Sequence, residues 1–589
     1  MLVVLRAAAM GVALIAARAD AAPRTRAGVA RPADARLRAL YTAEYAWRQQ
    51  LQAPDEDNKD APPGLPDVGP ATQAAKRARW TRTLAQLDAI RVVDLSPAGQ
   101  VDYAVYRGQI TALLNEQRYR DYEKPLTSDT SFWGDVAEAS RGRFLRERDY
   151  RDYLTMLRDI PRYFDQNIAN MRVGLSRGFT PARVTLTGRD IGVAQVVAAG
   201  SGEGSPFYAP FATMTTTIPA ATQAALRAQA KAAIRDGVVP AHRRLLAFLR
   251  QDYIPGARTT IAAADLPDGR AYYQSKIAEF TTETKSADAI HAIGLAEMAK
   301  IRARMQSVMD RTGFKGDLPA FLTFLRTDPR FYATTPQQLL DRAAWIAKSF
   351  DGKAAAYFGH LPRSRFAIEP VPADLAPFYT GGRGGPGIYL VNTYNLPARP
   401  LYSLPALTLH ESAPGHAFQM PLAMENKDLP AFRRDGYLSV YGEGWALYCE
   451  ALGEEMGMYQ TPYELFGMLS YQAWRASRLV VDTGIHAKGW TRERAQRYLH
   501  DNTALSDHEI ETEVDRYIAW PGQALSYYTG ELAIQRARAR AEQALGPKFD
   551  IRAFHDAVLA LGSVPVSEID RRIDRLIADG GKGPYPDEE

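Results

Sequence analysis

Cysteine is almost absent from this chain, which has one such residue, Cys449, among 589. An intrachain disulfide is therefore impossible, and zinc sites built from several cysteines are excluded. Because a chain of this length can bury cores large enough to fold without disulfides, export to an oxidising compartment remains allowed. Any metal in this protein must be held by histidine and carboxylate ligands.

Strong net charge and long apolar runs are absent as well. The formal net charge is +5 and no cluster of lysine or arginine stands out, which argues against a nucleic-acid partner. Arg6 precedes an apolar run at residues 7–17, which is too short to span a membrane, and Ala-Asp-Ala at residues 19–21 resembles a cleavage site. We expect residues 1–21 to be a secretory signal peptide, and the mature protein to be periplasmic or secreted without stable membrane insertion.

Helical periodicity dominates most of the mature chain. Apolar residues recur at helical spacing over residues 35–117, and residues 144–175 and 218–252 are typical of further long helices. Ser96 followed by Pro97 is a good helix start, because serine caps the first turn and proline fits its first position. The chain is therefore predicted to be mainly α-helical.

The composition changes after residue 362, which divides the mature chain into a helical region over residues 22–362 and a second one over residues 363–589. We expect the two regions to form one unit with a cleft between them. A glycine-rich stretch at residues 380–387 leads into residues 388–393, the best strand candidate. We expect the stretch to be a turn into an edge strand. Such a strand can bind an extended peptide by strand addition or form an ordinary hairpin, and the local sequence favours neither.

The central motif is the stretch His410-Glu411-Ser-Ala-Pro414-Gly415-His416. Two imidazoles and a carboxylate are the usual ligands of a hydrolytic zinc, and a glutamate beside the first histidine is the usual base. Residues six apart lie about 240° apart on an ideal helix, so a regular helix cannot direct both histidines to one metal. Pro414 and Gly415 must therefore break the helix if the two histidines are to converge.

A third ligand must come from another helix, and two carboxylates qualify. Glu443 and Glu450 are seven residues apart in an apolar helical segment, so they share a face and spacing cannot choose between them. One of them can bind the metal while the other braces a ligand histidine. Either could also be a solvated surface carboxylate, although the apolar neighbours favour burial and hence a partner.

Two polar clusters further along the chain could complete an active site. Arg478 and His486 lie in the first, RASRLVVDTGIHAKGW, and Tyr527 and Tyr528 follow a Pro-Gly pair in the second. An imidazole or a tyrosine hydroxyl can stabilise an oxyanion. From the residues alone, helix packing with surface ion pairs is the simpler interpretation of both clusters.

Four segments together resemble a large bacterial family known as domain of unknown function 885: HESAPGHAFQ, YGEGWALYCEALGEEMGMY, RLVVDTGIHAKGWTRERA and RYIAWPGQALSYYTGE. The resemblance extends upstream through HAIGLAEMAKIRARM and GIYLVNTYNLPAR, and so covers nearly all of the mature chain. The family is similar in outline to the helical zinc peptidases of the carboxypeptidase Taq, thimet oligopeptidase and angiotensin-converting enzyme groups. GEGWALYCE is also similar to the segment that carries the third zinc ligand of gluzincin aminopeptidases.

The resemblance implies that His410, His416 and Glu443 are the ligands of Zn²⁺ and that Glu411 is the general base. It thereby favours Glu443 over Glu450. The spacing of the two histidines is two residues longer than in those peptidases, so their ligand geometry transfers only if the Pro-Gly turn absorbs the insertion. The implied fold is a large helical zinc-peptidase-like architecture with a central cleft and a small β-sheet beside the metal site.

The expected activity is that of a metallopeptidase acting on short or unfolded peptides. His486, Tyr527 and Tyr528 are then candidate oxyanion donors, and Asn392 and Arg478 are candidate substrate contacts. The alternatives are a metal-dependent amidase or esterase acting on other bonds, and an exported binding protein that has lost catalysis. The general base argues against the last of these, because a binding protein has no use for it.

Overall fold

The computed structural model describes residues 31–52, 64–373 and 375–585. The expected signal peptide, residues 1–21, lies outside these ranges. Within them the chain is mainly α-helical with one small sheet, which confirms the predicted fold class at this level. Among these residues, no helix is long and apolar enough to cross a membrane.

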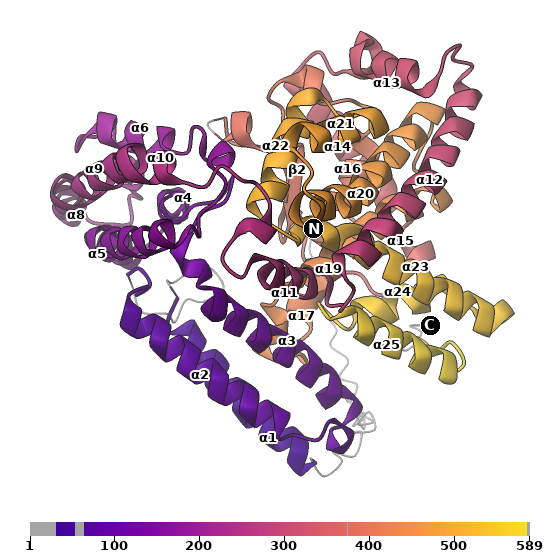
Figure 1. Cartoon of the computed structure of the whole chain (residues 1–589), viewed down its shortest axis with the longest axis horizontal. Helices are drawn as coiled ribbons and strands as arrows, with labels where there is room; N and C mark the ends of the chain where they lie inside the picture. Colours follow the sequence, from indigo (N-terminus) through magenta and orange to yellow (C-terminus); the bar gives the residue numbers. More distant parts are fainter. Residues whose placement is uncertain (1–30, 53–63, 374, 586–589) are drawn as a thin grey trace, which may run out of the picture.

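Three N-terminal helices extend from the lower part of the molecule in Figure 1. Proline occupies the first turn of each of them, and the predicted start at Ser96 is confirmed, because its hydroxyl accepts a hydrogen bond from Gly99 N at 3.0 Å. The helices are α1 (Pro32–Gln49), α2 (Pro70–Asp88) and α3 (Pro97–Tyr119).

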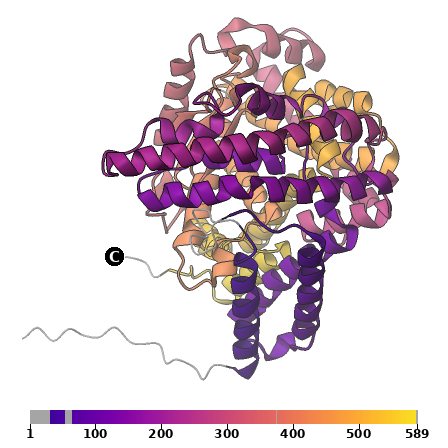
Figure 2. The same cartoon turned by 90° about the vertical axis from the view of Figure 1, so that its left-hand side faces the viewer.

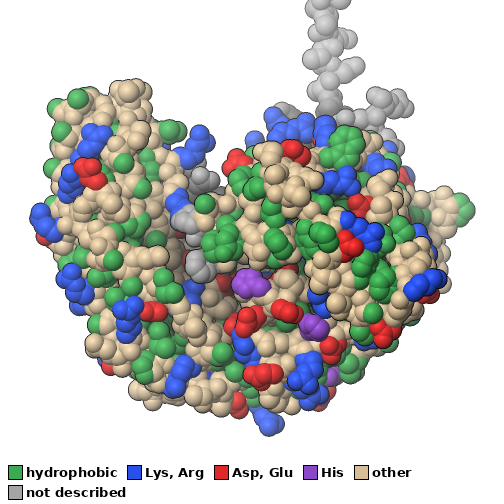
Figure 3. Space-filling view, turned by 90° about the horizontal axis from the view of Figure 1, so that it is seen from above, with side chains coloured by type: hydrophobic (Ala, Val, Ile, Leu, Met, Phe, Trp, Pro, Cys, Tyr) green, Lys and Arg blue, Asp and Glu red, His purple; other side chains and the backbone are tan. Residues whose placement is uncertain are grey.

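Residues 126–257 form a lobe around a hydrophobic core of their own, called the N-terminal lobe below. Two π-helical turns, Ile234–Val238 and Leu249–Tyr253, join its last three helices end to end, close to the predicted helix at residues 218–252. Figures 1 and 2 show the lobe beside the rest of the molecule, and Figure 3 shows a deep hollow between the two. Its helices are α4 (Phe132–Glu138), α5 (Glu147–Arg177), α6 (Ile191–Ala199), α7 (Ala209–Ala212), α8 (Ala220–Ala233), α9 (Val239–Phe248) and α10 (Ile254–Gly256).

The remaining helices build two larger cores that draw on the whole chain. Leu37 and Tyr106 share one core with Trp445, and Met305 shares the other with Leu479. Residue 362 is therefore not a boundary between separately packed cores. These helices are α11 (Gly269–Thr281), α12 (Ala287–Thr312), α13 (Leu318–Thr327), α14 (Pro336–Asp351), α15 (Ala354–Tyr357), α16 (Leu404–Glu411), α17 (His416–Glu425), α18 (Ala431–Arg434), α19 (Ser439–Glu455), α20 (Pro462–Lys488), α21 (Arg492–Asn502), α22 (Asp507–Ala519), α23 (Ser526–Leu545), α24 (Ile551–Leu559) and α25 (Val566–Ala578).

The sheet has three strands in the order β1-β3-β2: β1 (Ala367–Pro370), β2 (Gly382–Gly385) and β3 (Ile388–Val391). β1 runs parallel to β3, and β2 runs antiparallel to it. The predicted strand at residues 388–393 is present as β3, but its predicted place at the edge of the sheet is wrong, because β3 is the central strand. The glycine-rich stretch is itself the edge strand β2, since the chain reverses directly after it and forms a hairpin.

Candidate metal centre

The predicted break in the central helix is confirmed. α16 ends at Glu411 and α17 begins at His416, with non-helical dihedral angles at Ser412 and Gly415 between them. A Cβ atom on Gly415 would lie 1.8 Å from the carbonyl oxygen of His410, so only glycine allows this approach of the two helix ends. The Trp445 Nε1 atom of α19 donates a hydrogen bond to the Pro414 carbonyl at 2.8 Å and fixes the turn from the other side.

Gly415→Ala is expected to destabilise the fold by about 1–3 kcal/mol or more, because the added methyl group overlaps a backbone oxygen that cannot move freely. Urea unfolding followed by circular dichroism measures the change. Gly192→Ala in α6 is the matched control, since its Cβ atom would meet nothing within 4 Å. Equal stability of Gly415→Ala and the wild type would contradict the close approach at the turn.

The break brings the two histidine rings together, with centroids 4.9 Å apart. Glu443 of α19 reaches both of them: its Oε2 atom lies 3.4 Å from His410 Nε2 and 3.3 Å from His416 Nε2. Three ligands about 2.0–2.1 Å from a tetrahedral zinc are separated by roughly 3.3 Å, so these distances fit a metal better than a short hydrogen bond. The donor set of two imidazoles and one carboxylate also fits zinc. We call these three residues the metal cluster.

Glu411 approaches the same histidines from the edge of the sheet. Its Oε2 atom accepts a hydrogen bond from Gly384 N of β2 at 2.6 Å, and one of its oxygens lies within 4.8 Å of a ring nitrogen of each histidine. The shorter distances to Glu443 put that carboxylate, rather than Glu411, in direct contact with both rings. A Cβ atom on Gly384 would come within 1.7 Å of the Glu411 carbonyl oxygen, which explains why a glycine-rich strand passes here.

Glu450 contacts the opposite edge of His410. Its Oε1 atom lies 2.7 Å from His410 Nδ1 and the residue is fully buried. The Nδ1–H group therefore donates to Glu450, which leaves Nε2 facing Glu443, as in the carboxylate–histidine pairs that orient metal ligands. Spacing alone did not separate the two carboxylates, and the tertiary contacts give them different partners.

The electrostatics of the cluster favour positive charge between its side chains. Burial alone would lower the pKa of His410, but hydrogen bonds with Glu443 and Glu450 raise this pKa to about 10. Burial would likewise raise the pKa of Glu443, but the charges and hydrogen bonds of His416 and His410 hold it well below its usual value. The cluster thus attracts a cation, whether a proton or a metal ion.

Tyr527 is the predicted tyrosine that lies beside the cluster. Its ring stacks at 17° to the His410 ring, with centroids 6.5 Å apart. Arg516 Nη2 donates to its hydroxyl oxygen at 3.1 Å, so the hydroxyl proton remains free for another acceptor. Tyr528 has a different environment, because burial, together with the charges of Glu531 and of Glu297 in α12, raises the pKa of its hydroxyl.

His486 is a structural residue in this fold. Ala263 N donates to its Nδ1 atom at 2.9 Å, and its Nε2 atom lies 2.9 Å from the carbonyl oxygen of Tyr517. Burial lowers the pKa of His486 to about 3, so the ring is neutral. Both ring nitrogens are therefore occupied, and the expectation that His486 stabilises an oxyanion is corrected.

The two expected substrate contacts are also occupied by the protein itself. The Asn392 side chain donates at 3.0 Å to three backbone carbonyls within residues 376–380 and holds the loop before β2. Arg478 is 1% exposed, donates to Glu513 Oε2 at 2.8 Å and lies 4.0 Å from the centre of the Tyr527 ring. Both are corrected: Asn392 shapes a loop, and Arg478 supports Tyr527 from behind.

Two residues near the cluster were missed by the sequence patterns. The Tyr437 hydroxyl donates to Glu443 Oε1 at 3.1 Å, and the residue is 43% exposed, so it stands on the solvent side of the cluster. Arg516 holds Tyr527, as described above. The only signal was a pair of glycines, Gly444 and Gly530, whose backbones touch where α19 crosses α23 and so bring Tyr527 toward Glu443.

Comparison with known proteins supports the fold and the family. A crystal structure of a predicted lipoprotein from Colwellia psychrerythraea matches with a TM-score of 0.85 and 26% sequence identity, covering 93% of this chain and 99% of that one. A predicted lipoprotein of unknown function from Shewanella oneidensis matches with a TM-score of 0.67 and 18% identity over 92% of this chain and 98% of the other, which shows the fold alone. No curated protein matches the sequence. Residues 53–573 match the family described as bacterial protein of unknown function (DUF885), and the chain belongs to this family.

Proposed function

We propose that this protein is a zinc-dependent peptidase. The observation that carries the proposal is the metal cluster, in which one carboxylate oxygen lies at the spacing of zinc ligands from each of two ring nitrogens. The nearby carboxylate of Glu411, held in place by the β2 backbone, adds the base that such chemistry needs. A binding site for a structural metal would not require it.

Each residue has a defined part in this proposal. His410, His416 and Glu443 would hold the ion, and Glu450 would fix the ring of His410 through its Nδ1 atom. When bound, zinc supplies Lewis acidity toward the scissile carbonyl and toward water. Glu411 keeps Oε2 on Gly384 and accepts the proton of the attacking water at Oε1, which later passes to the leaving amine.

Tyr527 is the proposed oxyanion donor. Arg516 occupies its hydroxyl oxygen as donor, so the hydroxyl proton is available to the negative charge that develops on the substrate carbonyl. The guanidinium group of Arg478 stacks on the face of the Tyr527 ring and keeps the ring in place. Tyr437, on the exposed side of Glu443, would orient this carboxylate.

Tyr527→Phe is expected to lower kcat by about 10²–10³-fold, because one donor to the oxyanion is lost while the ring and its packing remain. KM and zinc content should change little. Tyr528→Phe is the matched control and should leave kcat within a few-fold of the wild type, since the Tyr528 hydroxyl is buried near Glu531 and Glu297 instead. Steady-state kinetics on one cleaved peptide compares the two, and equal effects of both substitutions would contradict the assignment.

The hollow in Figure 3 supports a substrate that enters as an extended chain. Burial would lower the pKa of Arg516, but Tyr527 and Glu513 raise it, and Asp129 of the N-terminal lobe adds a smaller contribution. Burial raises the pKa of Tyr379 in the loop before β2, and Glu138 of the lobe adds a smaller contribution. These charge interactions support a substrate path between the N-terminal lobe and the metal cluster. We infer that short or unfolded peptides fit there and folded proteins do not.

Export of the protein is the accompanying proposal. The sequence predicts a signal peptide, and both structural neighbours are described as predicted lipoproteins. A periplasmic or secreted peptidase meets peptides as substrates and has no nucleic acid nearby.

Digestion of a mixed peptide library, analysed by mass spectrometry, tests the function. Cleavage should stop when zinc is removed with EDTA and return when zinc is restored, because the side chains of the metal cluster cannot supply the Lewis acidity of the ion. A purified protein that binds no zinc would sink the proposal. Hydrolysis of esters or simple amides without any peptide cleavage would favour the amidase or esterase alternative, and zinc binding without hydrolysis would favour the binding protein.

A further inference from the structure

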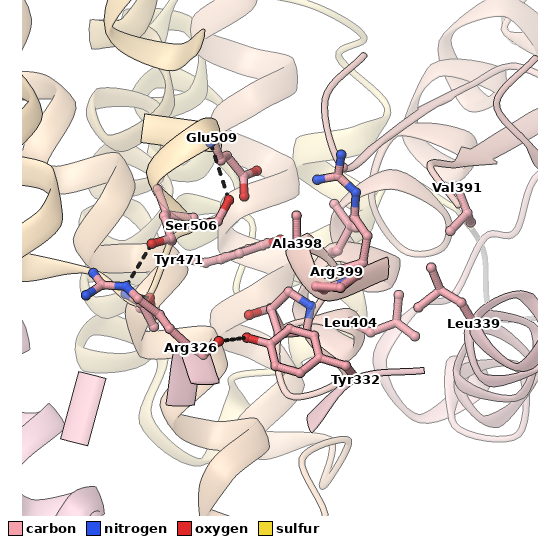
Figure 4. Close-up of a pocket in the computed structure, with 18 residues that line it drawn as sticks. Arg326, Tyr332, Leu339, Val391, Ala398, Arg399, Leu404, Tyr471, Ser506 and Glu509 are labelled. Carbon is pink, nitrogen blue, oxygen red and sulfur yellow. Dashed lines mark hydrogen bonds between the residues drawn. The ribbon is translucent and has the colours of Figure 1, made fainter. Parts of the chain in front are cut away.

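A cavity of about 60 Å³ lies beside the first turns of α16, away from the metal cluster at the end of this helix. It is bounded by α14, α20, the β2–β3 hairpin and the start of α22 (Figure 4). Leu339, Val391 and Leu404 form an apolar wall, and Arg399 and Glu509 bring charge to the rest of the lining. A cavity needs about 10–15 Å³ on this measure to hold one water molecule, so this one has room for a ligand group of a few heavy atoms.

The charges of Arg399 and Glu509 interact, but no hydrogen bond joins the two side chains, which is unusual for charged groups that are largely buried. In the described part of the chain, neither side chain has a hydrogen bond or an ion pair, and Arg399 Nε is buried without an acceptor. Figure 4 shows no bond between the two; the hydroxyl of Ser506 contacts only the backbone nitrogen of Glu509. Burial raises the pKa of the Glu509 carboxyl, and the charge of Arg399 acts in the opposite direction, so the two side chains lie close enough to bind one ligand together.

The other arginine of the cavity shows the contrast. Arg326 donates to the carbonyl oxygens of Leu505, His500 and Thr503, so its guanidinium is saturated and holds the loop before α22. Arg399 has no such structural task. Its donors, and the acceptors of Glu509, are available to a ligand.

A ligand with one charge would meet one favourable and one unfavourable group in this cavity. An anion would bind Arg399 but would be repelled by Glu509, and a cation would face the reverse situation. A molecule that carries a carboxylate and an ammonium group on neighbouring atoms complements both side chains with charge-assisted hydrogen bonds. Such a group is small enough for the space available, and the apolar wall suits a short side chain.

We propose that this cavity binds the zwitterionic head of a small α-amino acid, with its carboxylate on Arg399 and its ammonium group on Glu509. The site is separate from the metal cluster and needs no metal. It would give the protein a means to sense or retain the free amino acids that peptide hydrolysis releases.

Isothermal titration of the purified protein with glycine and with L-alanine tests the proposal. The titration is carried out in EDTA, because amino acids also chelate zinc, and is repeated with zinc. Acetate and methylamine, each with one of the two charges, should bind at least about tenfold more weakly than glycine, because each leaves one charged group unmatched. Failure of zinc binding or of peptide hydrolysis would leave this result unaffected, so the two proposals are tested independently.

Arg399→Gln and Glu509→Gln should each weaken amino-acid binding by about tenfold or more. Both variants should fold, since neither side chain has a hydrogen bond or an ion pair among the residues that the structure describes, and thermal unfolding verifies this. Arg311→Gln on the exposed surface of α12 is the matched control and should bind as the wild type does. Absence of amino-acid binding, equal binding of acetate, or binding that survives both cavity substitutions would overturn the proposal.

Discussion

Glu411→Gln is expected to lower the rate of peptide hydrolysis by about 10²–10⁴-fold while zinc content stays unchanged. The amide can still accept the hydrogen bond from Gly384 N through its oxygen, so the β2 strand and the helix break should keep their positions. What the substitution removes is the ability to take a proton from water. Initial rates on one peptide identified from the library, with zinc measured by mass spectrometry, give both quantities.

Glu425→Gln is the control for this experiment. Glu425 is the last residue of α17 and accepts hydrogen bonds from the backbone nitrogens of Arg363 and Ser364, away from the metal cluster. The rate of peptide hydrolysis by Glu425→Gln should therefore stay within a few-fold of the wild type. Hydrolysis that persists in Glu411→Gln at the wild-type rate would remove the general base from the proposed function. Loss of zinc together with activity would instead make Glu411 a ligand.

Glu443→Ala is expected to abolish zinc binding, because the carboxylate that joins the two ring nitrogens is lost. Glu450→Ala should weaken zinc binding by only about 10–100-fold, since it removes the partner that orients His410 and leaves all three ligand atoms in place. Competition titration with a zinc chelator of known affinity measures both variants on one scale.

Glu454→Ala is the matched control on the same helix. Glu454 is 46% exposed and pairs with Arg304 at the surface of α19, so its removal should leave zinc affinity unchanged. If Glu450→Ala abolished zinc binding and Glu443→Ala only weakened it, the roles of the two carboxylates would have to be exchanged. Equal effects of the two would indicate a ligand set larger than the metal cluster.

Much of the local structure could be predicted from the sequence. The long helices, the cap at Ser96 and the break between His410 and His416 all follow from residues within one or two turns of one another. Proline and glycine act on their own backbone and that of their nearest neighbours, so their effect can be derived without knowledge of the fold. For this reason, the need for a helix break at Pro414-Gly415 between His410 and His416 could be stated from the sequence, and the structure has this break.

Predictions about polar side chains were less reliable. His486 and Asn392 have the chemistry of site residues, but the fold uses every hydrogen-bonding atom that this role would need. Tyr437 carries no local signal and lies against Glu443. A polar residue in an apolar segment must find a partner, and the sequence does not say whether that partner is backbone, a side chain or a substrate.

The sequence by itself determined that the chain is mainly helical, that its central helix breaks at Pro414-Gly415, and that a metal would be held by histidine and carboxylate. The family resemblance favoured Glu443 over Glu450, but only the tertiary structure shows that Glu443 faces both ring nitrogens, that Glu450 faces His410 Nδ1, and that the glycine-rich strand holds Glu411. The physical reason is the range of the interactions. Helix propensity and chain breaks act between neighbours in sequence, whereas the partner of a buried polar group is set by packing between segments far apart in the chain.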